Sequence, residues 1–286
     1  MVDQLIEPSA VPQLLVDPVK RLGRSVACIA AIGTDGRTEA RGTGVFVELD
    51  GRQVVVTARH VVEGLRSTGG QTYLMLLDEE MPGYARVRTL TEGQRCELDL
   101  SHQIWASPDL DVAILEAPVG LSGARWLDAG VHSKTATKVR NLWRPLCSDL
   151  TSLPFFVLGY PNFAHLSFEA LRTEVLTAFP LVAYVVEWDD PWEPTTTRAP
   201  QIHVEVDARK PRRPSVVGGI EKLMAEQLFG ETATREALGG YSGSPLILVA
   251  QDGDFMIGIL QQGGHIFDAP RAIASAWDDV MAQIHQ

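Results

Sequence analysis

The feature that most constrains the fold is a series of short apolar segments separated by turns. Examples are Ser25–Ile32, Gly44–Glu48 and Gln53–Thr57, and the last two flank Asp50-Gly51, a dipeptide typical of tight hairpins. The segments are rich in β-branched residues, which favour strands. Short strands with regular turn punctuation predict an all-β barrel or sandwich.

The length and the course of the chain indicate two such units. A second strand-rich half follows a linker-like stretch at residues 120–131, and 286 residues accommodate two small β-barrels packed together. Within the second half, residues 207–238 differ from their surroundings, because Ile220–Phe229 has apolar residues at helical spacing. We interpret this segment as an insertion that contains a helix.

Composition excludes several classes of function. The net charge of −11 disfavours binding to nucleic acid, whose phosphates would repel the protein. Three cysteines do not suggest a disulfide framework. We see no secretory signal and no run of about 20 apolar residues that would cross a membrane. We therefore expect a cytoplasmic protein that contacts neither membranes nor nucleic acid.

Three short segments carry residues suited to nucleophilic catalysis. His60 follows a β-branched strand, Asp111 precedes the apolar strand Val112–Leu115, and Ser242 lies in a glycine-rich turn. A serine hydroxyl needs an adjacent base, histidine has a suitable pKa, and a carboxylate orients the imidazole. Asp109 is an alternative carboxylate, although Asp111 directly precedes the strand. The order histidine, aspartate, serine is one of three found among serine hydrolases.

The glycines around Ser242 suit a second requirement of this chemistry. Acyl transfer develops an oxyanion, which preorganised N–H groups stabilise. Glycine lets the backbone turn its N–H groups toward that oxygen. We predict the N–H groups of Gly240 and Ser242 as the oxyanion hole. No histidine lies in a metal-ligand spacing, so no metal site is predicted.

These segments resemble motifs of the trypsin/chymotrypsin-like serine peptidases, in the form found in bacterial members without a zymogen. The similar segments are Thr57-Ala-Arg-His-Val61, Gly240-Tyr-Ser-Gly-Ser-Pro245, Leu110-Asp-Val-Ala-Ile-Leu115, Gly42-Thr-Gly-Val-Phe46 and Gly258-Ile-Leu-Gln-Gln-Gly263. The resemblance implies peptide hydrolysis through a triad and an acyl-enzyme, without a cofactor. Tyr241 departs from the pattern, because zymogen-activated members carry aspartate there. We therefore expect no activation by a newly cut N-terminus.

The resemblance also implies a chymotrypsin-like, all-β architecture of two tandem antiparallel barrels. The predicted division is an N-terminal arm (1–23), a first barrel (24–125), a second barrel (126–268) and a C-terminal helix (269–286). The strand containing Gln261, Gln262 and Gly263 is similar to the strand that lines the substrate pocket. Glu236 matches the pocket acid only if the register across the inserted segment holds. These four residues are the predicted substrate contacts.

Alternatives to a constitutive protease remain open. The chain could be a catalytically weak, trypsin-like peptide-binding or scaffold protein. It could also be a peptidase that a regulatory protein partner or a ligand switches on, with the 207–238 insertion as the restraint. In each case the expected partner is a protein or peptide.

Overall fold

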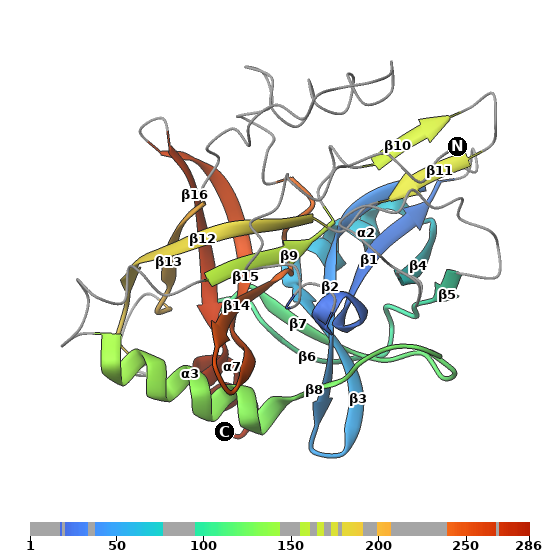
Figure 1. Cartoon of the computed structure of the whole chain (residues 1–286). Helices are drawn as coiled ribbons and strands as arrows, with labels where there is room; N and C mark the ends of the chain where they lie inside the picture. Colours follow the sequence, from blue (N-terminus) through green and yellow to red (C-terminus); the bar gives the residue numbers. More distant parts are fainter. Residues whose placement is uncertain are drawn as a thin grey trace.

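The structure is a computed structural model of the 286-residue chain, and two β-rich halves lie side by side in it (Figure 1). It describes residues 18, 21–33, 38–76, 95–143, 155–160, 165–168, 173–176, 179–190, 199–206, 239–266 and 269–286. The predicted 207–238 insertion and most of the predicted N-terminal arm lie outside these residues.

The first half is an eight-stranded sheet that curls into a half-barrel. Its strands are β1 (Val26–Ile32), β2 (Thr38–Leu49), β3 (Arg52–Ala58), β4 (Gln71–Leu76), β5 (Arg95–Glu97), β6 (Gln103–Ser107), β7 (Val112–Glu116) and β8 (Leu127–Asp128). The order along the sheet is β5-β4-β1-β2-β3-β7-β6, and β8 pairs in parallel with β2. All other pairings in this sheet are antiparallel. Among the described strands, β5 and β6 form the two edges.

The second half is a closed antiparallel barrel with the strand order β12-β13-β16-β15-β14-β9. Its strands are β9 (Phe155–Gly159), β12 (Phe179–Trp188), β13 (Ile202–Val206), β14 (Pro245–Ala250), β15 (Gly253–Ile266) and β16 (Ala269–Ala276). A separate hairpin consists of β10 (His165–Phe168) and β11 (Thr173–Leu176). The predicted two-part, mainly β architecture is thus confirmed, with a half-barrel first and a closed barrel second.

Three α-helices and one 3-10 turn are described over their whole length. They are η2 (Gly23–Ser25), α2 (Arg59–Thr68), α3 (Ala129–Trp143) and α7 (Trp277–Ile284). The helix α3 packs against α7 and β15 below the barrel (Figure 1). None of the described helices is long and apolar enough to span a bilayer.

The structure corrects two boundaries. The predicted C-terminal helix is present but begins at Trp277, because the preceding residues form β16, which pairs with both β13 and β15 and completes the barrel. The stretch predicted as a linker at residues 120–131 contains β8 and the start of α3. In both places tertiary pairing determines the structure of a segment with an indecisive local pattern.

Burial on both faces of the sheet explains the wholly apolar strands of the first half. In β1, Ala27 and Ile29 belong to a core cluster inside the half-barrel. Val26 and Cys28 belong to a larger cluster that continues into the second half. Successive side chains of a strand point to opposite faces. A sheet covered on both faces therefore needs apolar residues at every position, and the run does not alternate.

Candidate functional site

His60 and Asp111 are brought together by the pairing of β3 with β7. Ala58, the last residue of β3, lies opposite Val112, the first residue of β7. The residues just beyond this pair are His60, in the first turn of α2, and Asp111. Oδ2 of Asp111 lies 2.6 Å from Nδ1 of His60, and Oδ1 accepts a 3.0 Å hydrogen bond from the His60 backbone N–H. The carboxylate therefore contacts both the imidazole and the backbone of His60.

The backbone of Asp111 adopts an uncommon conformation that its surroundings hold. Its φ is 47°, in the left-handed region, which aspartate tolerates better than most residues. Its carbonyl oxygen accepts a 2.9 Å hydrogen bond from the N–H of Arg59. Strained backbone often marks functional positions when the surroundings over-determine it. The alternative carboxylate, Asp109, is exposed, and it is Asp111 that contacts the histidine.

The turn that carries Ser242 lies directly against the middle of β2 and the end of β3. The N–H of Thr43 donates a 2.9 Å hydrogen bond to the carbonyl oxygen of Ser242. Gly243 has φ +86°, and a Cβ there would lie 2.1 Å from the carbonyl oxygen of Thr43 and 3.0 Å from the N of Ala58. Only glycine fits this approach. The close packing brings the Ser242 turn to the end of β3, two residues before His60.

Thr43 is a buried connector between the two halves that the sequence did not single out. Its hydroxyl donates a 3.0 Å hydrogen bond to the carbonyl oxygen of Gly240 and accepts one of 2.9 Å from the N–H of Tyr160. Its carbonyl oxygen accepts a 2.7 Å hydrogen bond from the hydroxyl of Thr57. The sequence signal for Thr43 was its place between two glycines in the Gly42–Phe46 motif. Its hydrogen-bond partners Gly240 and Tyr160 lie far away in the chain, so the motif alone did not reveal them.

Two of the predicted contacts are not formed among the described residues. Within the described part of the chain, no hydrogen bond joins Ser242 to His60, and none engages the N–H of Gly240 or Ser242. The His60 side chain is 46% exposed, and Ser242 is half-buried. Hydrogen bonds of this kind often close only when substrate is bound. Tyr241, between the two proposed oxyanion donors, is fully buried, and burial raises its pKa well above 10.

The four predicted substrate contacts fall into three groups. The Gln261 side chain is buried, and its amide bonds to groups inside the protein. Gln262 and Gly263 lie on β15, in its pairing with β16. Glu236 lies outside the described residues. The assignment of a substrate pocket to Gln262, Gly263 and Glu236 stays a prediction, whereas the side chain of Gln261 binds groups inside the protein instead.

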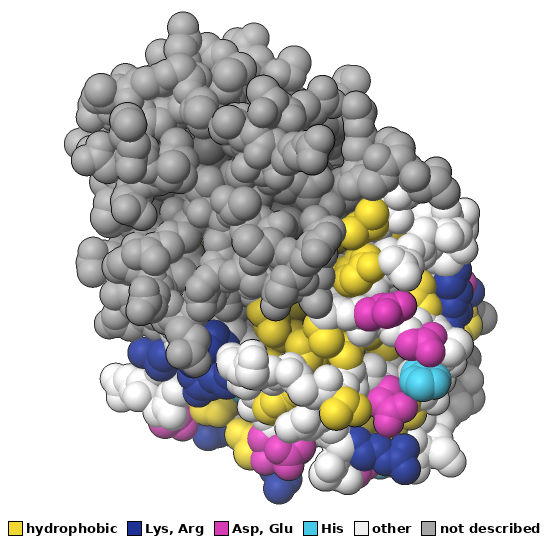
Figure 2. Space-filling view, turned by 90° about the vertical axis from the view of Figure 1, so that its right-hand side faces the viewer, with side chains coloured by type: hydrophobic (Ala, Val, Ile, Leu, Met, Phe, Trp, Pro, Cys, Tyr) yellow, Lys and Arg dark blue, Asp and Glu magenta, His cyan; other side chains and the backbone are white. Residues whose placement is uncertain are grey.

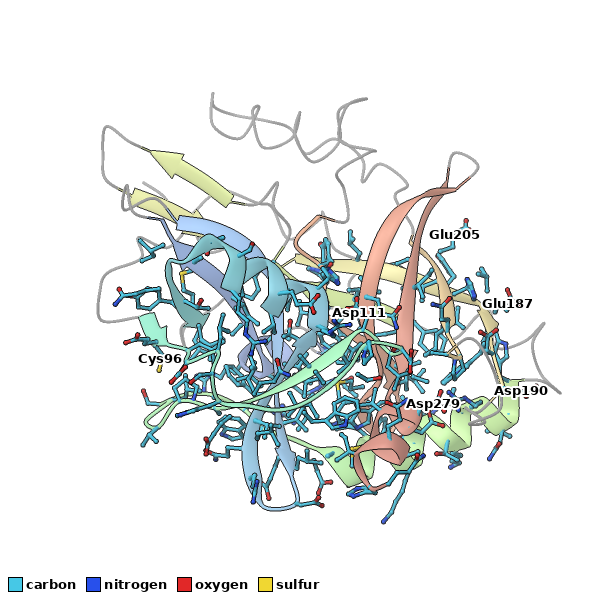
Figure 3. All side chains as sticks on the ribbon, turned by 180° about the vertical axis from the view of Figure 1, so that it is seen from behind. Cys96, Asp111, Glu187, Asp190, Glu205 and Asp279 are labelled. Atoms are coloured by element: carbon cyan, nitrogen blue, oxygen red, sulfur yellow. The ribbon has the colours of Figure 1, made fainter. Side chains whose placement is uncertain are left out.

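Figures 2 and 3 show one face of the described surface and the position of Asp111. Figure 3 shows Asp111 at the junction of the two halves, next to the long β15–β16 pair. On the face shown in Figure 2, acidic, basic and apolar side chains of the described residues are interspersed. Among the described residues, no group of three or more histidine, cysteine or acidic side chains is arranged to hold a metal ion.

Comparisons with known proteins were made for both sequence and structure. No protein-family model and no curated protein matches the sequence. One solved structure that is similar is described as the HtrA-type protease AlgW with a decapeptide, with a TM-score of 0.49 and 13% sequence identity. The match covers 93% of this chain and 66% of that one. At this level of similarity, function has to be argued from the geometry of the site.

Proposed function

We propose that this chain is a trypsin-like serine endopeptidase, with Ser242 as nucleophile, His60 as general base and Asp111 as the residue that orients the base. One observation carries the proposal. The turn bearing Ser242 is hydrogen-bonded to β2 and packed against the end of β3, where the hydrogen-bonded side chains of His60 and Asp111 also lie. Three residue types suited to acyl transfer thus come from three distant parts of the chain.

The proposed reaction has two halves. Oγ of Ser242 attacks the carbonyl carbon of a peptide bond while its proton passes to Nε2 of His60. Asp111 accepts the hydrogen bond of Nδ1–H and stabilises the imidazolium that forms. The tetrahedral intermediate collapses when the amine leaves with the proton from Nε2. Water then attacks the acyl-enzyme in the same manner and releases the acid and the free serine.

The oxyanion and the substrate backbone would use main-chain groups. The N–H groups of Gly240 and Ser242 are the proposed oxyanion donors, because both belong to the glycine-rich turn of the nucleophile, in which Gly240 has a φ of 88°. Such donors contribute about 10²–10³ in rate each in serine proteases. The main chain of Gln262 and Gly263 would pair with an extended peptide, and Glu236 remains a proposed pocket residue.

The test is labelling of the purified protein by a fluorophosphonate, which reacts with activated serines. We expect wild type to be labelled, and Ser242→Ala and His60→Ala to be unlabelled. A matched control is Ser67→Ala, which removes the hydroxyl of an exposed serine on α2 outside the proposed site. Labelling that survives in Ser242→Ala would place the nucleophile elsewhere.

Further arms separate the alternatives. If wild type is labelled only after addition of a peptide mixture or cell extract, the peptidase is gated by a partner. If wild type stays unlabelled under all conditions while peptides bind with micromolar affinity, the chain is a peptide-binding protein and the protease proposal is wrong. Cleavage of a labelled peptide library then identifies the substrate preference.

A further inference from the structure

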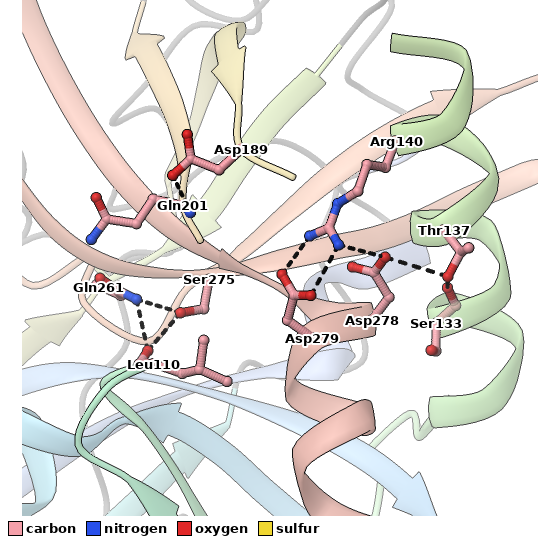
Figure 4. A network of polar contacts seen from close by, with 10 residues as sticks. All are labelled: Leu110, Ser133, Thr137, Arg140, Asp189, Gln201, Gln261, Ser275, Asp278 and Asp279. Carbon is pink, nitrogen blue, oxygen red and sulfur yellow. Dashed lines mark hydrogen bonds and ion pairs between the residues drawn. The ribbon is translucent and has the colours of Figure 1, made fainter. Parts of the chain in front are cut away.

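The carbonyl oxygen of Leu110, the residue directly before Asp111, is held by two side chains of the second half. Nε2 of Gln261, on β15, donates a 2.7 Å hydrogen bond to it. Oγ of Ser275, on β16, donates another of 2.6 Å. The amide of Gln261 also donates to Oγ of Ser275, so the three groups form a closed triangle (Figure 4).

The hydrogen-bonding capacities of the three groups match this arrangement. A carbonyl oxygen has two lone pairs, and here both are occupied. The amide nitrogen of Gln261 donates to both Leu110 and Ser275, and the single proton of the Ser275 hydroxyl also goes to Leu110. Both side chains are buried, with exposures of 7% for Gln261 and 0% for Ser275. Loss of either donor would leave a buried polar group partly unsatisfied.

The orientation of this carbonyl bears directly on Asp111. The peptide group between Leu110 and Asp111 is planar, so its carbonyl direction is coupled to the φ of Asp111. That φ is 47°, a conformation that a non-glycine residue does not favour on its own. The next carbonyl, that of Asp111 itself, is held from the other side by the N–H of Arg59. The carboxylate of Asp111 is therefore positioned from both halves of the molecule.

We infer that Gln261 and Ser275 are positioning residues, which hold Asp111 in the conformation that orients His60. They act through the backbone of Leu110 and touch neither the substrate nor the reacting atoms. Assembly of the second barrel thereby sets the geometry of an acid–base pair whose two members both belong to the first half. The effect of these two residues on catalysis rests on the proposed peptidase function. Their effect on the orientation of His60 does not.

The test uses the full-length chain with Ser275→Ala, Gln261→Met and the double variant. Methionine approximates the volume of glutamine but has no N–H donor. Ser25→Ala is the matched control, because Ser25 is also buried and its hydroxyl has no hydrogen-bond partner among the residues that the structure describes. Circular dichroism and the thermal midpoint establish that each variant is folded.

The decisive readout is the tautomer of His60, followed by ¹⁵N–¹H long-range NMR correlations of the imidazole ring. In wild type and Ser25→Ala we expect the Nδ1–H form, because Asp111 accepts that proton. In the positioning variants the ring should shift toward a mixture of tautomers, and fluorophosphonate labelling should slow by about 10- to 100-fold, as expected for a small misplacement of a catalytic group.

The outcomes are separable. An unchanged tautomer and a labelling rate within about twofold of wild type in the folded double variant would overturn the inference. If Gln261→Met does not fold, Ser275→Ala alone decides, since it removes a single oxygen. If wild type is never labelled, the peptidase proposal fails, and the tautomer comparison still tests the positioning role.

Discussion

Two buried titratable groups below the barrel have pKa values shifted in opposite directions, and together they should determine how stability depends on pH. Burial lowers the pKa of His132, on α3, to about 4. The neutral ring is used in the fold, since its Nδ1 accepts a 3.1 Å hydrogen bond from the N–H of Met256. Burial raises the pKa of Asp278, on α7, to about 6, while Arg140 opposes the shift and Asp279 adds to it.

The signs of the two contributions are opposite. His132 favours the folded state above its unfolded pKa of 6.5, and this stability is lost as the pH falls through about 4. Asp278 favours the folded state below its unfolded pKa of 3.8, and this stability is lost as the pH rises through about 6. At 1.36 kcal/mol per pH unit, each group contributes about 3 kcal/mol. Between pH 4 and 6.5 the two effects nearly cancel.

The substitution Asp278→Asn removes the pH-dependent contribution of Asp278 to stability and leaves that of His132. The guanidinium of Arg140 keeps its two hydrogen bonds to Asp279, and the asparagine oxygen can still accept from Thr137 (Figure 4). We expect the free energy of unfolding at pH 7.5 to rise by about 2–3 kcal/mol, because an unfavourably buried charge is gone. At pH 4 or below, the free energy of unfolding of the variant should match that of wild type. The variant should therefore lose about 3 kcal/mol of stability on acidification from pH 7 to 4.

The assay is urea unfolding followed by circular dichroism between pH 3.5 and 8. The control is Asp252→Asn, which makes the same change of charge at an exposed position and should leave the shape of the pH profile unaltered. A fall in stability at pH 7.5, or a pH profile parallel to that of wild type, would refute the reasoning. Either result would mean that the attraction between Asp278 and Arg140 outweighs the cost of burial.

Two substitutions test how the halves are joined at the site. Gly243→Ala should abolish fluorophosphonate labelling and lower the thermal midpoint strongly, whereas Gly120→Ala, at φ +88° with no atom within 4 Å of the added Cβ, should cost only about 1 kcal/mol. Equal effects would contradict the close-approach argument. Thr43→Val removes the bonds to Gly240 and Tyr160, and should lower the free energy of unfolding by about 2 kcal/mol and slow labelling about tenfold. A normal labelling rate would remove Thr43 from the site.

The sequence predicted the elements of this fold better than their boundaries. Segments such as Val54–Thr57 and Val112–Leu115 have enough β-branched and apolar residues to be assigned as strands without tertiary information. The helix α3 was not predicted, and the start of the C-terminal helix was placed at 269 instead of Trp277. In β16 the small residues suit either state, and pairing with β13 and β15 decides between them.

For the candidate site, residue types and chain order determined much of the hypothesis, because nucleophilic chemistry needs a serine, a base and an orienting acid in recognisable local settings. The sequence alone also placed Ser242 in a glycine-rich turn, between Gly240 and Gly243. Tertiary structure decided which carboxylate contacts His60, since that depends on β3 pairing with β7.

The tertiary structure alone also decided that Thr43 connects the halves and that Gln261 and Ser275 hold the backbone before Asp111. Gln261 lies 151 residues from Leu110 along the chain, and Ser275 lies 165. A hydrogen bond between such distant groups leaves no local pattern in the sequence, because it forms only when both barrels are assembled and packed against each other.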